Sequence, residues 1–213
     1  MRKIWMLVLL VGLFSCENKD AEQEVEPVEK VKEEVVIGEA EEEEVSYHFD
    51  DEVAFARMAY KEMSEGRYDL LTRYTSGKIL FSPYAYIDTA TAREVTIEEI
   101  KAGTDEVHFW GIQDGSGDSL LMSTPEYLNQ YIFGVDILGA EELSIQTYEG
   151  EAPKAYGSEL HNVHQLYPEA TFVEFYIAPS EEGYLDWKAL IFVVEKQGED
   201  YLLKAIIHNQ WTT

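Results

Sequence analysis

The sequence predicts an α+β domain over residues 45–213, with N-terminal helices packed on a curved, mainly antiparallel sheet. Three observations support this class. Apolar side chains recur with a helical period from Phe49 onward, the last third of the chain contains three predicted strands, and a turn joins the final two as a hairpin. Helices that precede a run of antiparallel strands are typical of α+β domains.

The helical period is clearest in the first element. Its apolar side chains follow one another at spacings of four, three, four and three residues: Phe49, Val53, Ala56, Tyr60 and Met63. These positions share one face of an α-helix, which begins after two aspartates and ends at Gly66. A short second helix is expected to turn Leu70, Leu71 and Tyr74 inward and to stop before Gly77.

The middle of the chain alternates short elements with turns. Pro83 argues that Phe81–Asp88 is an edge or a loop rather than a central strand. Thr96–Glu99 has the pattern of a capping box, which predicts a helix of one or two turns that ends at Gly103. A strand is then expected at Val107–Gln113.

The stretch Asp114-Gly115-Ser116-Gly117-Asp118 is interpreted as a turn, after which residues 119–122 return as a strand. It also has carboxylates suited to calcium, but it lacks the spaced third ligand and the closing glutamate of a calcium loop. Thr124 then has the features of an N-cap, because Pro125 and an acid follow it. The helix that begins there is expected to run to about Phe133.

The remaining segments predict β-structure. A strand is expected at Leu143–Tyr148, followed by an irregular stretch to Val163. Three further strands are expected at Thr171–Ala178, Trp187–Lys196 and Tyr201–Trp211. Gln197–Asp200 is the turn between the last two. Both faces of Leu190–Val194 are apolar, which indicates a central strand that is covered on both sides.

This element order and the closing hairpin (Val194-Glu195-Lys196, then Tyr201 to His208) resemble the nuclear-transport-factor-2-like, or SnoaL-like, cone. A second resemblance is to an uncharacterised domain of secreted bacterial proteins. The shared pieces are Phe81-Ser82-Pro83-Tyr84-Ala85-Tyr86, Trp110 to Gly117, and Ile206-Ile207-His208-Asn209-Gln210-Trp211-Thr212. That family implies a domain boundary and an extracytoplasmic location, without an activity.

The chain opens with Arg2 and Lys3, followed by an apolar run from Ile4 to Phe14. The run is too short to span a bilayer, which takes roughly 20 residues, and it is typical of a secretory signal. Its end, Leu13-Phe14-Ser15-Cys16, resembles the lipobox of bacterial lipoproteins. The resemblance implies that residues 1–15 are a signal peptide and that Cys16 is lipidated. The alternative is an ordinary secretory signal with an incidental cysteine.

Residues 16–44 predict an acidic, disordered tether behind the lipidated cysteine. Glu17–Glu44 holds 13 acids and three bases and has no aromatic residue. Like charges repel one another, and such a segment has little apolar surface to offset the entropy of ordering. An alternative is a short amphipathic helix, because Val25, Val28, Val31 and Val35 recur at helical spacing.

The charge of the whole chain is −26, from 42 acids and 16 bases. Nucleic acids are bound through clustered Lys and Arg, which this chain lacks. Nucleic acid is therefore not an expected partner. The expected partners are the lipid bilayer, reached through acylated Cys16, and an unknown small molecule or envelope protein. The expected location is the cell envelope, at the outer membrane, on its periplasmic or surface face.

Aromatic side chains supply the candidate ligand-binding site, because binding pockets are commonly lined by aromatic groups. The four candidates are Tyr84, Tyr86, Trp110 and Trp187. His108 lies two residues from Trp110 on the same face of the expected strand. Paired with Asp88 it has the groups of a general acid or base, and packing in the core or at its rim is the alternative.

No cofactor or metal is expected. His161 and His164, with Asp186 or Glu174, have side chains that suit zinc, but two histidines three residues apart in an irregular stretch are a common coincidence. The leading hypothesis is a lipid-anchored envelope protein with a non-catalytic domain that binds a ligand or partner. The alternatives are a SnoaL-like pocket enzyme (isomerase, dehydratase or hydrolase) that uses the His108–Asp88 pair, and a purely structural envelope component.

Overall fold

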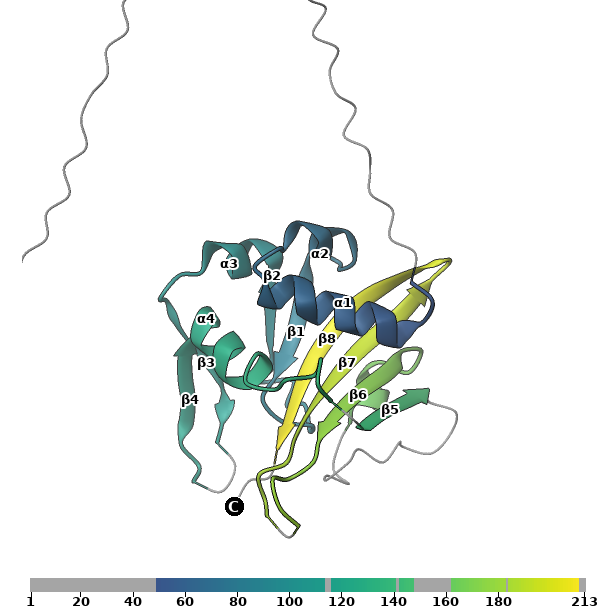
Figure 1. Cartoon of the computed structure of the whole chain (residues 1–213). Coiled ribbons are helices and arrows are strands. Elements are labelled where there is room, and N and C mark those ends of the chain that lie inside the picture. Colours follow the sequence, from purple (N-terminus) through teal and green to yellow (C-terminus); the bar gives the residue numbers. More distant parts are fainter. Residues whose placement is uncertain (1–48, 114–115, 141, 148–161, 183, 211–213) are drawn as a thin grey trace, which may run out of the picture. The chain divides into compact units, whose positions relative to one another are not determined.

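The computed structural model describes residues 49–113, 116–140, 142–147, 162–182 and 184–210, which are coloured in Figure 1. Residues from Val45 onward form one compact unit. Its described part combines short helices with a mainly antiparallel sheet, so the α+β class is confirmed. In the same ranges, no helix has the length and apolar character needed to cross a membrane.

The first helix, α1, spans Glu52–Ser64 and follows the expected period. Asp51 caps it, because one carboxylate oxygen accepts a hydrogen bond from the Ala54 N–H at 2.8 Å. Its buried side chains are Phe55, Ala56, Ala59, Tyr60 and Met63. The second helix, α2, spans Asp69–Arg73 and buries Leu71, and the ring of Tyr74 is buried directly after it.

Six strands form the main sheet in the order β2-β1-β8-β7-β6-β5. Their bounds, in that order, are Arg93–Thr96, Lys78–Ser82, Asp200–Gln210, Lys188–Gln197, Thr171–Ile177 and Glu142–Thr147. Neighbours are antiparallel, except that β1 runs parallel to β8. Every residue of β7 from Ala189 to Val194 is buried, which confirms that this segment is central and covered on both sides.

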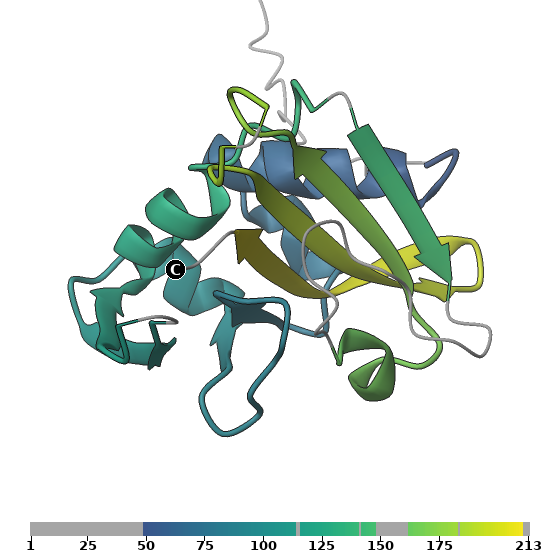
Figure 2. The same ribbon diagram turned by 90° about the horizontal axis from the view of Figure 1, so that it is seen from below.

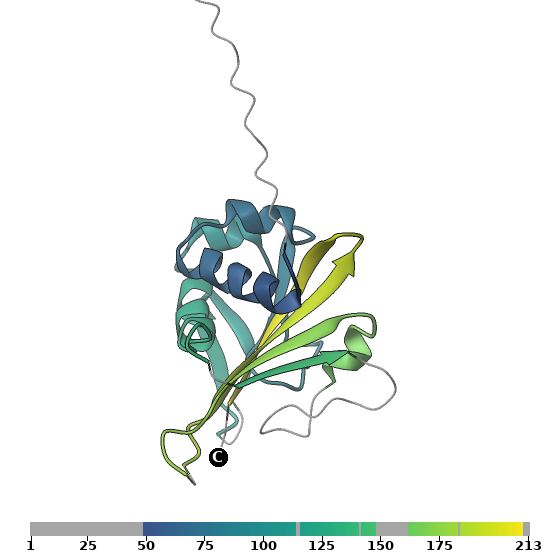
Figure 3. The same cartoon turned by 45° about the vertical axis from the view of Figure 1, so that its right-hand side comes forward.

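The two faces of the sheet have separate cores. Figures 2 and 3 show α1 on one face and the short helix α5 (Val163–Leu166) on the other. Alternation along β7 supplies both cores: Leu190 and Phe192 pack toward α1, and Ile191 packs with Val163 of α5.

On the second face, two hydrogen bonds join Asn162 to Ile87. The Asn162 side chain accepts from the Ile87 N–H and donates to the Ile87 carbonyl, both at 2.8 Å. Ile87 belongs to the loop between β1 and β2, and its side chain is buried in the second core. The two bonds therefore fix the middle of that loop, residues 83–92, to the start of α5.

A separate two-stranded ribbon carries the region around Trp110. It consists of β3 (Val107–Ile112) and β4 (Ser119–Ser123), which are antiparallel. The helix α3 (Ile97–Ala102) precedes the ribbon and is capped by Thr96, as predicted. After β4, the chain enters α4 (Thr124–Tyr127), which continues as a π-helical turn, η1 (Leu128–Ile132).

The structure corrects the sequence prediction in two places. Phe81 and Ser82 belong to β1, an inner strand between β2 and β8, whereas residues 83–88 form a loop, as expected. The missing N–H of Pro83 falls in that loop. The N-cap of α4 is Ser123 rather than Thr124, since the Ser123 side chain accepts from the Glu126 N–H. Residues 114–115, residues 148–161 and Trp211 lie outside the described ranges.

The cap of α4 gives a test of the fold. Ser123 and Glu126 form a complete capping box, in which Glu126 Oε2 accepts from the Ser123 N–H at 2.8 Å. We expect Ser123→Ala to lower the free energy of unfolding by roughly 1–2 kcal/mol, because a buried cap is lost. Ser119→Ala, at the exposed start of the same strand, is the control. Urea unfolding monitored by tryptophan fluorescence measures both, and equal stabilities would contradict the capping role.

Candidate functional site

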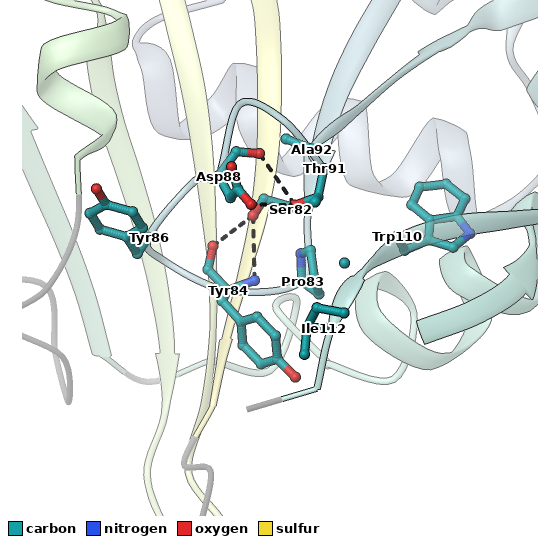
Figure 4. Close-up of a pocket in the computed structure, with 10 residues that line it drawn as sticks. Ser82, Pro83, Tyr84, Tyr86, Asp88, Thr91, Ala92, Trp110 and Ile112 are labelled. Carbon is teal, nitrogen blue, oxygen red and sulfur yellow. Dashed lines mark hydrogen bonds between the residues drawn. The ribbon is translucent and has the colours of Figure 1, made fainter. Parts of the chain in front are cut away.

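A shallow groove lies between the loop after β1 and the end of β3 (Figure 4). Its volume is about 130 Å³. Ten residues line it: Ser82, Pro83, Tyr84, Tyr86, Asp88, Thr91, Ala92, Trp110, Gly111 and Ile112. The groove thus joins the main sheet, through β1, to the two-stranded ribbon, through β3.

Short-range hydrogen bonds give the 83–92 loop its shape. The Ser82 hydroxyl donates to the Tyr84 carbonyl at 2.8 Å. Further along, the Asp88 carboxylate accepts from the Ala90 N–H at 2.9 Å and from the Thr91 hydroxyl at 3.2 Å. This is the pattern of an Asx turn, in which the aspartate stabilises its own loop. Both oxygens of Asp88 are therefore engaged in local structure.

Gly111 keeps the groove open on the side of β3. Its φ of 126° lies where side chains are disfavoured, and the strand register shifts between Phe109 and Ile112. A Cβ at Gly111 would lie 3.7 Å from Thr91 Oγ1 and 3.8 Å from Pro83 Cγ. The space that a side chain would occupy is thus left free between the strand and the loop. A glycine inside a strand commonly marks such a bulge.

Trp110 lies beneath the groove and is 1% exposed. Its indole Nε1–H donates to the Met122 carbonyl at 2.9 Å. The ring of Tyr127 stacks on it, with centroids 3.8 Å apart and planes 10° apart, and Tyr131 stacks on Tyr127 at 5.0 Å. Because Trp110 is covered in this way, it is a wall of the groove rather than an exposed platform for a ligand.

A polar cluster lies next to Trp110. Arg93 Nη1 is 2.6 Å from Glu99 Oε1, and the Thr124 hydroxyl donates to the same oxygen at 2.8 Å. His108 Nε2 lies 3.7 Å from Glu99 Oε1. Partial burial raises the pKa of Glu99, but hydrogen bonds from Arg93 and Thr124 oppose it, so that the pKa is lowered overall. The cluster therefore holds a charged carboxylate beside His108.

Behind the groove, His208 anchors the loop. Its Nδ1 lies 3.1 Å from the Pro83 carbonyl, and a carbonyl can only accept, so Nδ1 carries the proton. The ring is 1% exposed and meets Tyr131 edge-on, with centroids 5.1 Å apart. Burial lowers the pKa of His208 to about 4, so the ring is neutral at physiological pH.

The structure brings together some of the residues chosen from the sequence and separates others. Tyr84, Tyr86, Trp110 and Asp88 line the groove. Trp187 does not: it precedes β7 and packs on Tyr176 of β6, with ring centroids 5.9 Å apart.

His108 does not line the groove either, and its polar neighbour is Glu99 rather than Asp88. It lies two residues from Trp110 on β3, so its ring points to the same side of the ribbon as Trp110. Arg93, at the start of β2, pairs with Glu99 on that side. The expected His108–Asp88 pair is therefore replaced by a pair between His108 and Glu99.

Sequence reasoning missed Pro83, Gly111 and Ile112 as groove residues and His208 as the support of the loop. One signal was present, because a glycine between Trp110 and Ile112 interrupts a predicted strand. The bond from His208 to Pro83 joins residues 125 positions apart, and no local pattern reports it.

The described residues contain no group of three or more His, Cys, Asp or Glu side chains placed to hold a metal ion. Of the residues considered for zinc, His161 lies outside the described ranges. Asp186 accepts a hydrogen bond from the Ser180 N–H at 3.0 Å, and both His164 and Glu174 are buried.

Comparison with known proteins does not assign the chain to a family. No family model matches the chain, and no curated protein matches it. One solved structure is similar, a DUF4783 family protein from Bacteroides ovatus, with 10% sequence identity and a TM-score of 0.30. The match covers 73% of this chain and 94% of that one. A TM-score of this size does not establish a shared fold.

The buried His208 gives a pH-dependent prediction. Its pKa is 6.5 when unperturbed and about 4 in the fold, so its stabilising contribution is complete above about pH 6.5 and is lost as the pH falls toward 4. The full loss is about 3 kcal/mol, and about 2 kcal/mol of it is expected between about pH 7 and pH 5.

Urea unfolding at the two pH values measures this dependence. The control is His208→Asn, which keeps an N–H donor near Nδ1 but cannot titrate. It should be less stable than the parent at neutral pH, because the smaller side chain leaves a cavity, and its stability should change much less with pH. A parent and a variant that lose the same stability on acidification would show that His208 is not the responsible group.

Proposed function

We propose that this chain is a lipid-anchored cell-envelope protein whose domain binds a ligand or a protein partner without catalysis. The groove between the 83–92 loop and β3 is the proposed binding site. The observation that favours it is the lining: exposed apolar groups at the rim, Tyr86 and Ile112, over a rigid wall formed by Trp110. Concave sites with aromatic and aliphatic walls are the usual places for a ligand.

The size of the groove indicates how a ligand would use it. Pockets that enclose a whole small molecule measure roughly 300–1,000 Å³, whereas this one is about 130 Å³. That volume suits one side chain or one ring that projects from a larger molecule. A partner protein, a peptide or a glycan end satisfies this description.

The chemistry of the lining favours binding over catalysis. A general acid or base must be within hydrogen-bond reach of the reacting group and be free to exchange a proton. Asp88 is the carboxylate among the ten lining residues, it already accepts two hydrogen bonds from its own loop, and none of the ten is a histidine. The alternative of a SnoaL-like enzyme with a His108–Asp88 pair therefore receives no support from the geometry.

Two finer assignments belong to the same proposal. The first is the lipid anchor at Cys16 and the location at the outer membrane, which rest on Leu13-Phe14-Ser15-Cys16. The second is membership of the NTF2-like cone folds, which is supported by α1 packed on one sheet face and by the closing β7–β8 hairpin.

The anchor is tested by mass spectrometry of the native protein. We expect the chain to begin at Cys16 and to carry fatty acyl groups on it, because the thiol and the amino group freed by cleavage are the sites that lipoprotein processing modifies. Cys16→Ser should keep residues 1–15 and carry no acyl group. Detection of an unmodified thiol on Cys16 of the parent would contradict the anchor.

The groove is tested by a thermal-shift screen against libraries of peptides, oligosaccharides and metabolites. A ligand that binds the folded state raises the melting temperature by mass action. Tyr86→Ala and Ile112→Ala remove exposed rim groups, so we expect each to leave the unliganded melting temperature nearly unchanged and to reduce the shift. Leu138→Ala, at a similarly exposed position outside the groove, is the control. A shift that survives both rim variants would place the ligand elsewhere.

A further inference from the structure

The β3–β4 ribbon has an apolar outer face. Along the two strands, side chains alternate: Trp110 and Leu120 are buried against the rest of the domain, whereas three apolar side chains on the opposite face are exposed. These outward residues are Val107, Phe109 and Leu121, with exposed fractions of 60%, 40% and 60%. We call them the ribbon face.

The ribbon face is a single patch. Phe109 and Leu121 are direct cross-strand partners, and Val107 is two residues from Phe109 on the same strand, so the three side chains are neighbours. In Figure 1 the ribbon lies on the side of the main sheet away from β5. Isolated exposed apolar residues are ordinary, but a contiguous apolar patch commonly marks an interaction surface.

The surroundings of the ribbon face are acidic. Asp105 and Glu106 directly precede β3, Asp118 directly precedes β4, and all three are exposed. No Lys or Arg occurs between Lys101 and Lys154. The bases nearest in sequence are already paired, Lys101 with Asp69 and Arg93 with Glu99. Among the described residues from 102 to 123, the charged side chains are therefore all acidic.

This charge decides among the candidate occupants of the ribbon face. Residues from Val45 onward contain 29 acids and 11 bases, so a second copy of the chain would bring like charge to the rim. Glu17–Glu44, with 13 acids and three bases, and an anionic bilayer would do the same. A segment that presents apolar side chains flanked by Lys or Arg complements both the patch and its rim.

We propose that the ribbon face is a docking surface for a cationic, amphipathic segment of another envelope protein. Its apolar side chains cover Val107, Phe109 and Leu121, and its basic side chains approach Asp105, Glu106 and Asp118. The surface is distinct from the groove, because none of the three apolar residues lines it. The two sites can therefore be tested separately.

The test uses a synthetic probe and the mature chain, residues 16–213, with Cys16→Ser to keep it free of lipid. The probe is a fluorescent peptide of alternating Leu and Lys, and its twin has Glu in place of every Lys. Binding is measured by fluorescence anisotropy in about 150 mM salt, which weakens non-specific attraction between the peptide and the acidic residues 17–44. The ribbon variant is Phe109→Ser with Leu121→Ser, and the matched control is Tyr184→Ser with Leu185→Ser, a pair of similar exposure in the β6–β7 loop.

The expected result is that the Lys peptide binds the parent, that the ribbon variant binds it at least about tenfold more weakly, and that the loop control changes little. The Glu twin should not bind. No binding of the Lys peptide, equal binding by the parent and the ribbon variant, or equal binding of the two peptides would overturn the proposal. Sedimentation equilibrium of the parent and of the ribbon variant supplies the remaining check. If the parent is a dimer and the ribbon variant is a monomer, a second copy of the chain covers the ribbon face, which would overturn the proposal.

Discussion

The contact between Trp110 and Tyr127 is the interaction on which the arrangement of this domain depends. Two-stranded ribbons are marginally stable alone, and the β3–β4 ribbon is not hydrogen-bonded into the main sheet. It is held instead by the indole of Trp110, which stacks on Tyr127 and donates to the Met122 carbonyl. The ring thus joins β3 to β4 and both to α4.

The same contact is the first member of a chain that reaches the main sheet. Tyr127 stacks on Tyr131, Tyr131 meets the ring of His208 on β8, and His208 donates to the Pro83 carbonyl. The last two steps join segments that are distant in sequence. The two walls of the groove, the 83–92 loop and the end of β3, therefore have fixed positions although no strand pairing connects them.

Neutral His208 is well suited to this position. A charged imidazolium would be costly in a buried site without an anionic partner, and the lowered pKa of His208 avoids that cost at physiological pH. The ring fills space beneath the loop and still satisfies the carbonyl of Pro83. This role is structural, and it explains why a buried histidine near a groove need not indicate catalysis.

Local sequence patterns predicted the helices, strands and turns that neighbouring residues determine. The four-three spacing in α1, the apolar run of β7 and the turn between β7 and β8 each depend on neighbouring residues, and each is found at its expected place. β1 and β2 were not predicted as strands. β1 is five residues long and pairs with β8 through contacts such as Leu80 with Ala205, so its stability comes from a strand more than 100 residues away.

The residues of the candidate site were likewise predictable only where they are close in sequence. Tyr84, Tyr86 and Asp88 are close in sequence and meet in one loop, so their proximity was predictable. Trp187 was grouped with them by residue type and His108 by its spacing from Trp110. Packing on Tyr176 and pairing with Glu99 place the two elsewhere. Burial of Trp110 also has a tertiary cause, because Tyr127 covers it. Which residues line a groove therefore depends on contacts that no single segment encodes.

The most direct test of the account is a crystal structure of the protein purified from its native cells, examined for a molecule bound in the groove. The account predicts density against Pro83, Tyr84 and Ile112, above a Trp110 ring that is still stacked on Tyr127. A ligand bound elsewhere on the domain, or a groove closed by its own side chains, would contradict it.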